Sequence, residues 1–213
     1  MANLIFKYSA MNGGKTINVL QTAYNYEENN YKVTIIKSKV DTKGKDKIVS
    51  RNGMERKVDI LLKSDDSLLK DKYYKIYYTS KVILVDEVEL LSVSQIEELW
   101  TIAHLINIPV IVYGLKSNFM GEIFSPSVAK LIAVSDDIDE IGSSCLCKCG
   151  KKAIFNARKV NNKYVSEGET VLIDDGKKKN IEYVPLCGDC YLKYVRINDE
   201  NVKKLTNLVN KVL

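Results

Sequence analysis

The chain has 213 residues, enough to bury a full hydrophobic core in one domain, with or without a small appendage. Its composition, 46% hydrophobic and 28% charged, is that of an ordinary globular protein. No apolar run approaches the roughly 18 residues of a membrane span, and Lys7 and the loop after it arrive too early for a secretory leader, so we expect neither a membrane protein nor a secreted one. We therefore expect a cytoplasmic protein.

The formal net charge is +5, and the lysines are scattered along the chain apart from one run at 177–179. A mild positive balance suits the binding of polyanionic nucleotides, although a lysine-rich solvated surface is the simpler interpretation. In a reducing compartment we do not expect the five cysteines to form disulfides.

Short apolar runs alternate with helical patterns over the first 140 residues or so. The runs are too continuous for half-exposed strands, which favours a parallel sheet covered on both faces. The expected strands are Leu4–Phe6, Val33–Ile36, Val82–Asp86 and Val110–Tyr113, and the expected helices are Lys15–Glu28 and Ser92–Ile106. This order predicts an α/β fold with a doubly wound, mainly parallel sheet that binds its ligand at the carboxyl ends of the strands. The lysine-rich stretch Asp41–Lys57 is expected to be a loop or a mobile excursion from that edge of the sheet.

The character of the chain changes near residue 145, where cysteines and short alternating runs replace the helices. We therefore expect three parts: a nucleotide-binding domain over 1–144, a small cysteine-containing domain over 145–195, and a tail over 196–213. The apolar spacing in the tail suggests a terminal helix. The only histidine, His104, falls inside an expected helix and is interpreted as structural.

A candidate phosphate-binding loop follows the first expected strand. Its residues are Ser9, Ala10, Met11, Asn12, Gly13, Gly14, Lys15 and Thr16. In such a loop, backbone N–H groups approach the phosphates of ATP, the lysine meets the β- and γ-phosphates, and the threonine hydroxyl is a ligand of Mg²⁺. The usual motif opens with glycine where this chain has Ser9, so a chance surface turn is the competing interpretation.

Two carboxylates, Asp86 and Glu87, end the apolar run that begins at Val82. Nucleotide hydrolases and kinases use such a strand-end carboxylate, here Asp86, to hold Mg²⁺ near the γ-phosphate. Because strand side chains alternate between faces, Glu87 has a possible second role as a general base for an acceptor hydroxyl. An isolated pair of this kind merely caps a turn, but the phosphate loop upstream favours the functional interpretation.

The cysteines form two groups some forty residues apart. They are Cys145, Cys147 and Cys149, followed by Cys187 and Cys190. Two such groups fit a structural zinc site with four thiolates, which would hold a loop rather than perform chemistry. The second pair has a specific spacing, but the first group offers Cys149 with either Cys145 or Cys147. Buried or redox-active thiols without metal are the alternative.

Together with Tyr113–Phe119 and Gly121–Phe124, these motifs resemble in order and spacing the type II family of thymidine kinases, and its bacterial branch in particular. The resemblance covers about residues 3 to 195. It implies a RecA-like P-loop domain joined to a zinc-ribbon or lasso domain that closes over the nucleoside. It also implies transfer of the ATP γ-phosphate, with Mg²⁺, to the 5′-hydroxyl of thymidine or deoxyuridine in nucleotide salvage. A homotetramer and feedback inhibition by thymidine triphosphate are further implications.

The resemblance assigns catalytic roles by position. Lys15 and the rest of the phosphate loop would bind ATP, Thr16 and Asp86 would serve Mg²⁺, and Glu87 would take the proton from the 5′-hydroxyl. Asp41 falls where the family has the aspartate of an Asp-x-Arg motif near the transferring phosphate, with lysine at position 43 in place of arginine.

The resemblance also assigns a base pocket and a metal site. The pocket would be lined by Met11, Leu90, Leu115, Phe119 and Tyr183. The zinc ligands would be Cys147, Cys149, Cys187 and Cys190, which leaves Cys145 spare.

Three places depart from the family pattern. Glu89 and Leu90 stand where glutamine and phenylalanine are common, so a carboxylate replaces an amide and an aliphatic wall replaces an aromatic one. Met120 follows the pocket phenylalanine where a polar residue is frequent, and the lasso has Asp174–Gly176 and lysines where a Gly-Gly pair is usual. We expect the chain to retain phosphoryl transfer despite these changes. The sequence makes no prediction for its affinity for the nucleoside or for its inhibition by the triphosphate.

Two other functions remain as alternatives. A P-loop ATPase or binding module whose zinc ribbon contacts nucleic acid would hydrolyse ATP without a nucleoside and bind nucleic acid in a salt-sensitive way. A weakened homologue acting as a nucleotide sensor would bind thymidine triphosphate with little turnover. The kinase is the preferred interpretation, and we do not expect nucleic acid or membrane as a partner.

Overall fold

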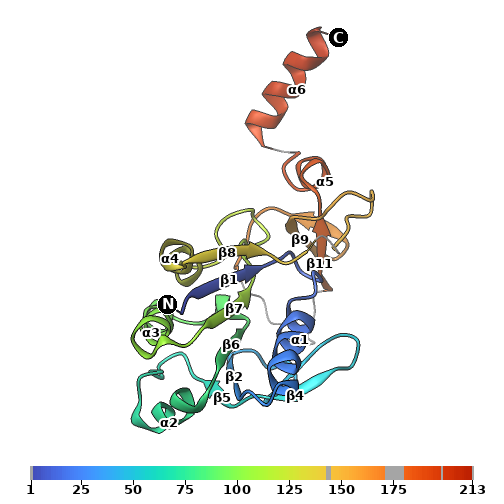
Figure 1. Cartoon of the computed structure of the whole chain (residues 1–213). Helices are drawn as coiled ribbons and strands as arrows, with labels where there is room; N and C mark the ends of the chain where they lie inside the picture. Colours follow the sequence, from blue (N-terminus) through green and yellow to red (C-terminus); the bar gives the residue numbers. More distant parts are fainter. Residues whose placement is uncertain (1, 143–144, 171–179, 198, 213) are drawn as a thin grey trace. The chain divides into compact units, whose positions relative to one another are not determined.

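The computed structural model describes residues 2–142, 145–170, 180–197 and 199–212 (Figure 1). The described chain divides into two compact units that interleave along the sequence. Unit 1 comprises Met1–Ser9, Gly14–Lys116 and Ile123–Gly142, and unit 2 comprises Ala10–Gly13, Ser117–Glu122 and Ser143–Leu213, each in its described residues. The lasso departure at Asp174–Gly176 lies outside the described residues.

Unit 1 is built on a parallel sheet in the order β5–β2–β6–β7–β1–β8. Its strands are β1 (Leu4–Tyr8), β2 (Val33–Ser38), β5 (Ile60–Leu62), β6 (Val82–Asp86), β7 (Val110–Gly114) and β8 (Asp137–Glu140). The four strands expected from the apolar runs are all present. Two more were missed, because β5 has only three residues and every residue of β8 is exposed.

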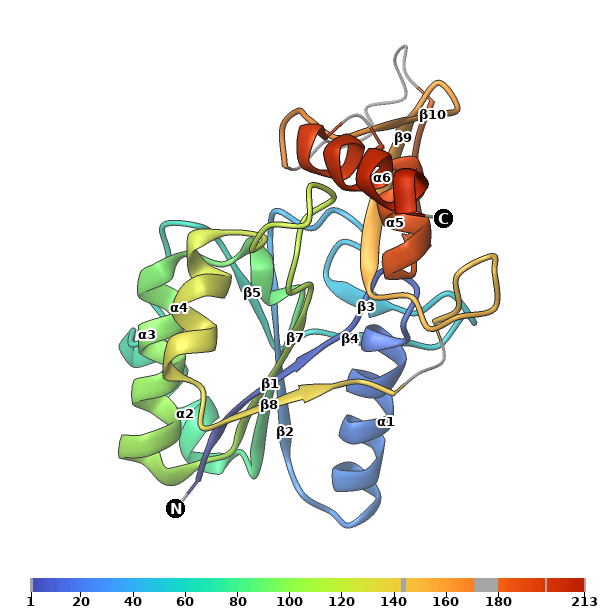
Figure 2. The same cartoon turned by 90° about the horizontal axis from the view of Figure 1, so that it is seen from above.

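Helices cover both faces of this sheet (Figure 2). One face lies against α1 (Lys15–Glu28), and the other against α2 (Asp71–Thr79), α3 (Val93–Thr101) and α4 (Pro126–Val134). Side chains of β6 alternate between the two cores: Val82 and Leu84 pack on the α1 side, Ile83 and Val85 on the other. The predicted doubly wound α/β fold is therefore confirmed.

Several local predictions need correction. The stretch Asp41–Lys57 is not simply a loop, because β3 (Lys47–Val49) and β4 (Glu55–Lys57) pair in it as an antiparallel hairpin. These strands have three residues each, too short for a periodic pattern to register.

The second expected helix is also different, since α3 ends at Thr101 and a π-helical turn, η2 (Ile102–Asn107), continues from it. Ser92 does cap α3, in a capping box with Gln95. Helix α2 was missed because only Tyr73 and Tyr77 of it are buried. Helix α4 was missed although Ser125 followed by Pro126 is a recognisable start signal.

Unit 2 contains an antiparallel sheet in the order β10–β9–β11. Its elements are β9 (Phe155–Val160), β10 (Lys163–Val165), β11 (Ile181–Leu186), α5 (Gly188–Tyr194) and α6 (Glu200–Val212). Ala157, Val184, Leu186 and Tyr191 form its core with three of the cysteines. Helix α6 corresponds to the helix expected in the tail. The three-part division at residues 144 and 195 stays a prediction.

No helix within the described ranges is long and apolar enough to cross a bilayer.

Candidate nucleotide-binding and catalytic site

The loop from Ser9 to Thr16 joins β1 to α1, as the motif predicts. Helix α1 begins at Lys15, with Gly14 as its N-cap at φ 82° and ψ 17°. This left-handed conformation is inexpensive only for glycine. The side chains of Ser9 and Lys15 are buried. The loop therefore places a lysine and the N-terminal end of a helix at the carboxyl end of β1, the arrangement that binds phosphate.

Asp86 and Glu87 differ in their surroundings. Asp86 is the last residue of β6 and is buried on the α1 side of the sheet, two residues beyond Leu84. Glu87 leaves the strand in a left-handed conformation, φ 52° and ψ 49°, which is uncommon for a residue other than glycine. Its backbone N–H donates to Asp86 Oδ1 at 3.1 Å. A backbone outlier of this kind beside a buried carboxyl marks a candidate functional position.

The predicted catalytic residues of unit 1 interact electrostatically. The pKa of Asp86 is raised to about 7, mainly by burial and then by the charges of Glu87 and Asp41, while Lys15 and the backbone N–H of Glu87 oppose the rise. Residues from α1, β6 and the segment after β2 therefore share one electrostatic environment. A carboxyl poised in this way ionises readily beside a cation, and hydroxyl and carboxylate oxygens such as those of Thr16 and Asp86 are the donors that Mg²⁺ prefers.

Glu89 is a buried acid that sequence reasoning singled out only as a departure. It lies in the short 3-10 turn η1 (Val88–Leu90) and is 4% exposed. Its Oε2 has no hydrogen-bond partner among the described residues. A Cβ at Gly114 of β7 would collide with this oxygen and with the side chain of Val88, so any larger residue there would displace the carboxyl. Burial, reinforced by the charge of Glu87, holds the pKa of Glu89 well above its usual range.

Two pocket residues predicted from the resemblance also belong to unit 1. Leu115 follows β7 and is buried, whereas Leu90 is half-buried at the end of η1. The other three, Met11, Phe119 and Tyr183, belong to unit 2.

Within unit 2, Met11 is held through its backbone. Its N–H donates to Asn156 Oδ1 at 2.7 Å, and its carbonyl accepts from the thiol of Cys145 at 3.1 Å. Asn156 also donates to the carbonyl of Ser117 at 3.2 Å. A single buried asparagine of β9 thus connects the segment of Met11 to the segment of Phe119. Sequence reasoning missed Asn156, because it lies among short alternating runs and belongs to no recognisable motif.

Arg158 joins the remaining two predicted pocket residues. It is 1% exposed, and its guanidinium lies 3.7 Å from the ring centroid of Phe119. Its Nε and Nη2 donate to the hydroxyl of Tyr183 at 3.0 and 2.8 Å, and Nη2 also donates to the carbonyl of Thr170 at 2.9 Å. The carbonyl of Phe119 accepts from Tyr191 at 2.8 Å. Sequence reasoning missed Arg158 because its partners are distant along the chain.

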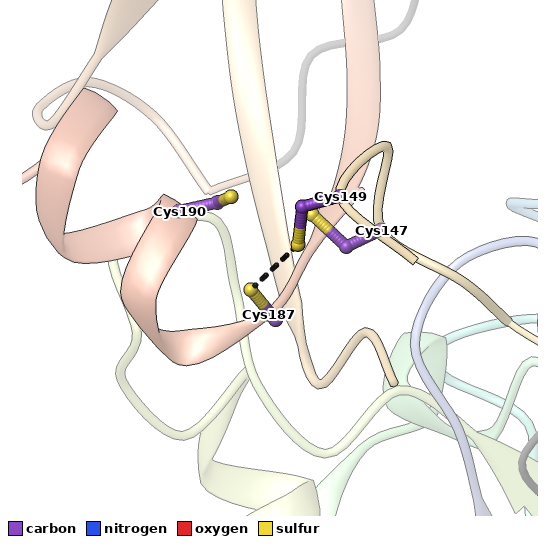
Figure 3. A group of neighbouring side chains, drawn as sticks. All are labelled: Cys147, Cys149, Cys187 and Cys190. Carbon is purple, nitrogen blue, oxygen red and sulfur yellow. Dashed lines mark hydrogen bonds between the residues drawn. The ribbon is translucent and has the colours of Figure 1, made fainter. Parts of the chain in front are cut away.

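Four cysteines of unit 2 converge in Figure 3. They are Cys147, Cys149, Cys187 and Cys190, and their sulfur atoms all lie within 4.8 Å of one another. Tetrahedral zinc with Zn–S bonds of about 2.3 Å needs sulfurs about 3.8 Å apart, so this donor set fits the metal. Burial raises the pKa of the Cys147 thiol, but hydrogen bonds from the N–H groups of Cys149 and Cys187 and from the thiols of Cys190 and Cys149 together outweigh it and lower the pKa to about 6. A readily formed thiolate suits a metal ligand.

Comparison with known proteins decides the family. A family model described as thymidine kinase matches residues 2–191. The chain belongs to the thymidine kinase family. The thymidine kinase of Francisella tularensis subsp. holarctica is 36% identical over 190 residues, which cover 88% of this chain and 95% of that protein. The thymidine kinase of Enterococcus faecalis is 35% identical over 201 residues, covering 94% and 100%.

A viral thymidine kinase is similar to the same degree. That of Enterobacteria phage T4 is 35% identical over 189 residues, covering 88% of this chain and 94% of that protein. The family resemblance inferred from the motifs is confirmed. The thymidine kinase model ends at residue 191, so α6 lies beyond it.

We predict that Glu89→Gln flattens the pH dependence of stability. The pKa of Glu89 in the folded protein is raised above its ordinary value of 4.5, so the folded state retains a proton that the unfolded chain loses. Stability from this group is complete below the unfolded pKa and falls as pH rises toward the folded pKa, by up to about 1.4 kcal/mol per pH unit. Glutamine cannot ionise and removes this loss.

Urea denaturation without nucleotide, at about pH 5 and about pH 8, measures the effect. The free energy of unfolding of Glu89→Gln should rise relative to wild type at the higher pH. The control is Glu28→Gln, at an exposed position of α1. If the free energy of unfolding varies with pH in the same way for wild type and Glu89→Gln, the raised pKa of Glu89 is contradicted.

We predict that Cys190→Ser lowers bound zinc well below about one ion per chain and lowers the unfolding temperature, because a structural zinc site contributes directly to folding. The matched control is Cys145→Ser, since Cys145 bonds to Met11 outside the four-sulfur cluster and serine preserves that donor. Zinc is measured by mass spectrometry of the purified protein. Equal zinc in the two variants would rule out the cluster as the metal site.

Proposed function

We propose that this chain is an ATP-dependent thymidine kinase that transfers the γ-phosphate of ATP to the 5′-hydroxyl of thymidine, giving the 5′-monophosphate. The observation that carries the proposal is membership of the thymidine kinase family over almost the whole chain, together with a phosphate loop whose Lys15 interacts with the carboxyl of Asp86. Deoxyuridine, which lacks only the methyl group of thymine, is a second acceptor in this proposal.

The proposed roles follow the surroundings of each side chain. Lys15 and the loop N–H groups bind the ATP phosphates, and Thr16 and Asp86 hold Mg²⁺, which supplies charge neutralisation at the phosphates. Glu87 accepts the proton of the 5′-hydroxyl. It is half-buried, whereas the neighbouring Asp86 is buried, and this difference in exposure supports Glu87 as the carboxylate that meets the acceptor hydroxyl.

The base pocket in this proposal is lined by Met11, Leu90, Leu115, Phe119 and Tyr183. Phe119 and Tyr183 are supported by their shared contact with Arg158, which fixes both rings. The four-cysteine cluster binds zinc and stabilises the lasso. On the basis of the family resemblance, the proposal also includes a cytoplasmic location, a homotetrameric assembly and inhibition by thymidine triphosphate.

The test of the function is phosphate transfer from ATP and Mg²⁺ to thymidine, deoxyuridine, deoxycytidine or no acceptor, with products identified by mass. We expect 5′-monophosphate formation that depends on thymidine. Loss of ATP without any acceptor would instead establish an ATPase. Tight binding of thymidine triphosphate without turnover would establish a nucleotide sensor.

A second test addresses the general base. Glu87→Gln preserves the shape of the side chain but removes its basicity, so kcat should fall by about 10²–10⁴ while ATP affinity stays nearly unchanged. The control is Glu97→Gln, an exposed position of α3. Unchanged kcat in Glu87→Gln would remove Glu87 from the proton transfer.

A further inference from the structure

Lys37 is a buried cation at the carboxyl end of β2. Its side chain is 1% exposed, and it follows Val33 and Ile35 on the α1 side of the sheet. Its Cα pairs in register with that of Asp86 on β6. An ammonium in such a place is strongly unfavourable unless acceptors surround it, because burial removes its hydration.

The acceptors come from the segment that follows β2. Nζ of Lys37 lies 3.0 Å from Oδ2 of Asp41. It also donates to the carbonyls of Lys43, of Lys47 at 3.1 Å and, at the longer distance of 3.4 Å, of Lys45. The four acceptors therefore belong to alternate residues from 41 to 47. The chain wraps around the ammonium as a binding loop wraps around a metal cation.

The backbone of the segment is bent to make this possible. Gly44 and Lys45 both adopt left-handed conformations, with φ of 72° and 54°. A Cβ at Gly44 would lie 2.7 Å from the carbonyl oxygen of Lys47 and 2.6 Å from the side chain of Val49, so only glycine fits. Without the ammonium, the carbonyls turned inward would lose their shared donor. The conformation of the segment 41–47 therefore depends on the ammonium group of Lys37.

The same contacts fix Asp41 and Lys43. Asp41 is held at both oxygens, because Oδ2 pairs with Lys37 and Oδ1 accepts from the backbone N–H of Lys43 at 3.0 Å. The carbonyl and the N–H of Lys43 are both engaged, and its side chain is exposed. Asp41 in turn influences Asp86, since its charge raises the pKa of that carboxyl.

We infer that Lys37 is a positioning residue, an internal cation that shapes the segment 41–47 and so fixes Asp41 and Lys43 relative to the transferring phosphate. The inference rests on the proposed kinase function for its catalytic consequence, but the shaping of the segment does not depend on that function. Lys37 itself contacts no substrate in this proposal.

The test uses Lys37→Ala, which replaces the cation by a hole lined by one carboxylate and several carbonyls. A small displacement of catalytic groups can cost about 10² in rate, so we expect kcat to fall by about that factor with a smaller change in the KM for thymidine. The missing atoms are those of n-propylammonium. Adding n-propylammonium should restore activity by about tenfold or more, the order of effect expected from one hydrogen-bonded charge. Tetramethylammonium, which has no N–H donor, should not restore activity. The control Lys39→Ala removes an exposed lysine nearby and should respond to neither ion.

Hydrogen exchange of the 41–47 amides supplies a readout that needs no activity. Exchange in this segment should accelerate in Lys37→Ala and slow again with n-propylammonium. If wild type shows no kinase activity, the proposed function fails while this readout still decides the shaping role. Unchanged exchange and unchanged kcat in Lys37→Ala would overturn the inference.

A second variant covers the case in which Lys37→Ala does not fold. Lys37→Met fills the volume without charge, and we combine it with Asp41→Asn. If Lys37 acts through Asp41, kcat of the double variant should be close to that of Asp41→Asn, within about threefold, because residues acting as a unit are not additive. If kcat of the double variant falls by the product of the two single losses, the inference is overturned. It is also overturned if neither Lys37 variant folds, because Lys37 would then act in folding alone.

Discussion

Burial of charge at the carboxyl end of the parallel sheet is the constraint on which the rest of unit 1 depends. Because helices cover both faces of the sheet, the strand ends carry polar side chains into an environment with little water. Lys37, Asp86 and Glu89 are all buried there. The three charges are accommodated differently: acceptors surround Lys37, Asp86 interacts with Lys15, and burial raises the pKa of Glu89.

These solutions suit phosphoryl transfer. The reaction requires little covalent work from the protein, so catalysis consists mainly of positioning and of charge stabilisation. Fixed groups of opposite charge that are already desolvated do not need to reorganise when the phosphate arrives. The left-handed backbone at Glu87 separates its surroundings from those of Asp86, which allows two adjacent carboxylates to differ in exposure and hence in role.

Unit 2 holds its predicted site residues in place by different interactions. Its core is small, so hydrophobic burial alone is limited, and four sulfur atoms within 4.8 Å of one another form a donor set that fits a metal cross-link. Asn156 and Arg158, both from β9, hold the segments of Met11 and Phe119 through hydrogen bonds and a stacked guanidinium. An arginine suits this position because its planar group stacks and donates in several directions at once.

The sequence by itself determined the features that depend on neighbours along the chain. The phosphate loop, the strand of β6 ending in two carboxylates and the C-x₂-C pair could all be recognised, since each motif is local. The expected strand Val33–Ile36 stopped before Lys37, because a charged residue ends an apolar pattern, whereas the observed strand continues through Ser38. Only the tertiary structure supplied the acceptors of Lys37, the Gly114 that faces Glu89 and the rings that meet Arg158. A buried charge is tolerated only where partners distant in the sequence compensate it, and those partners are brought together by folding.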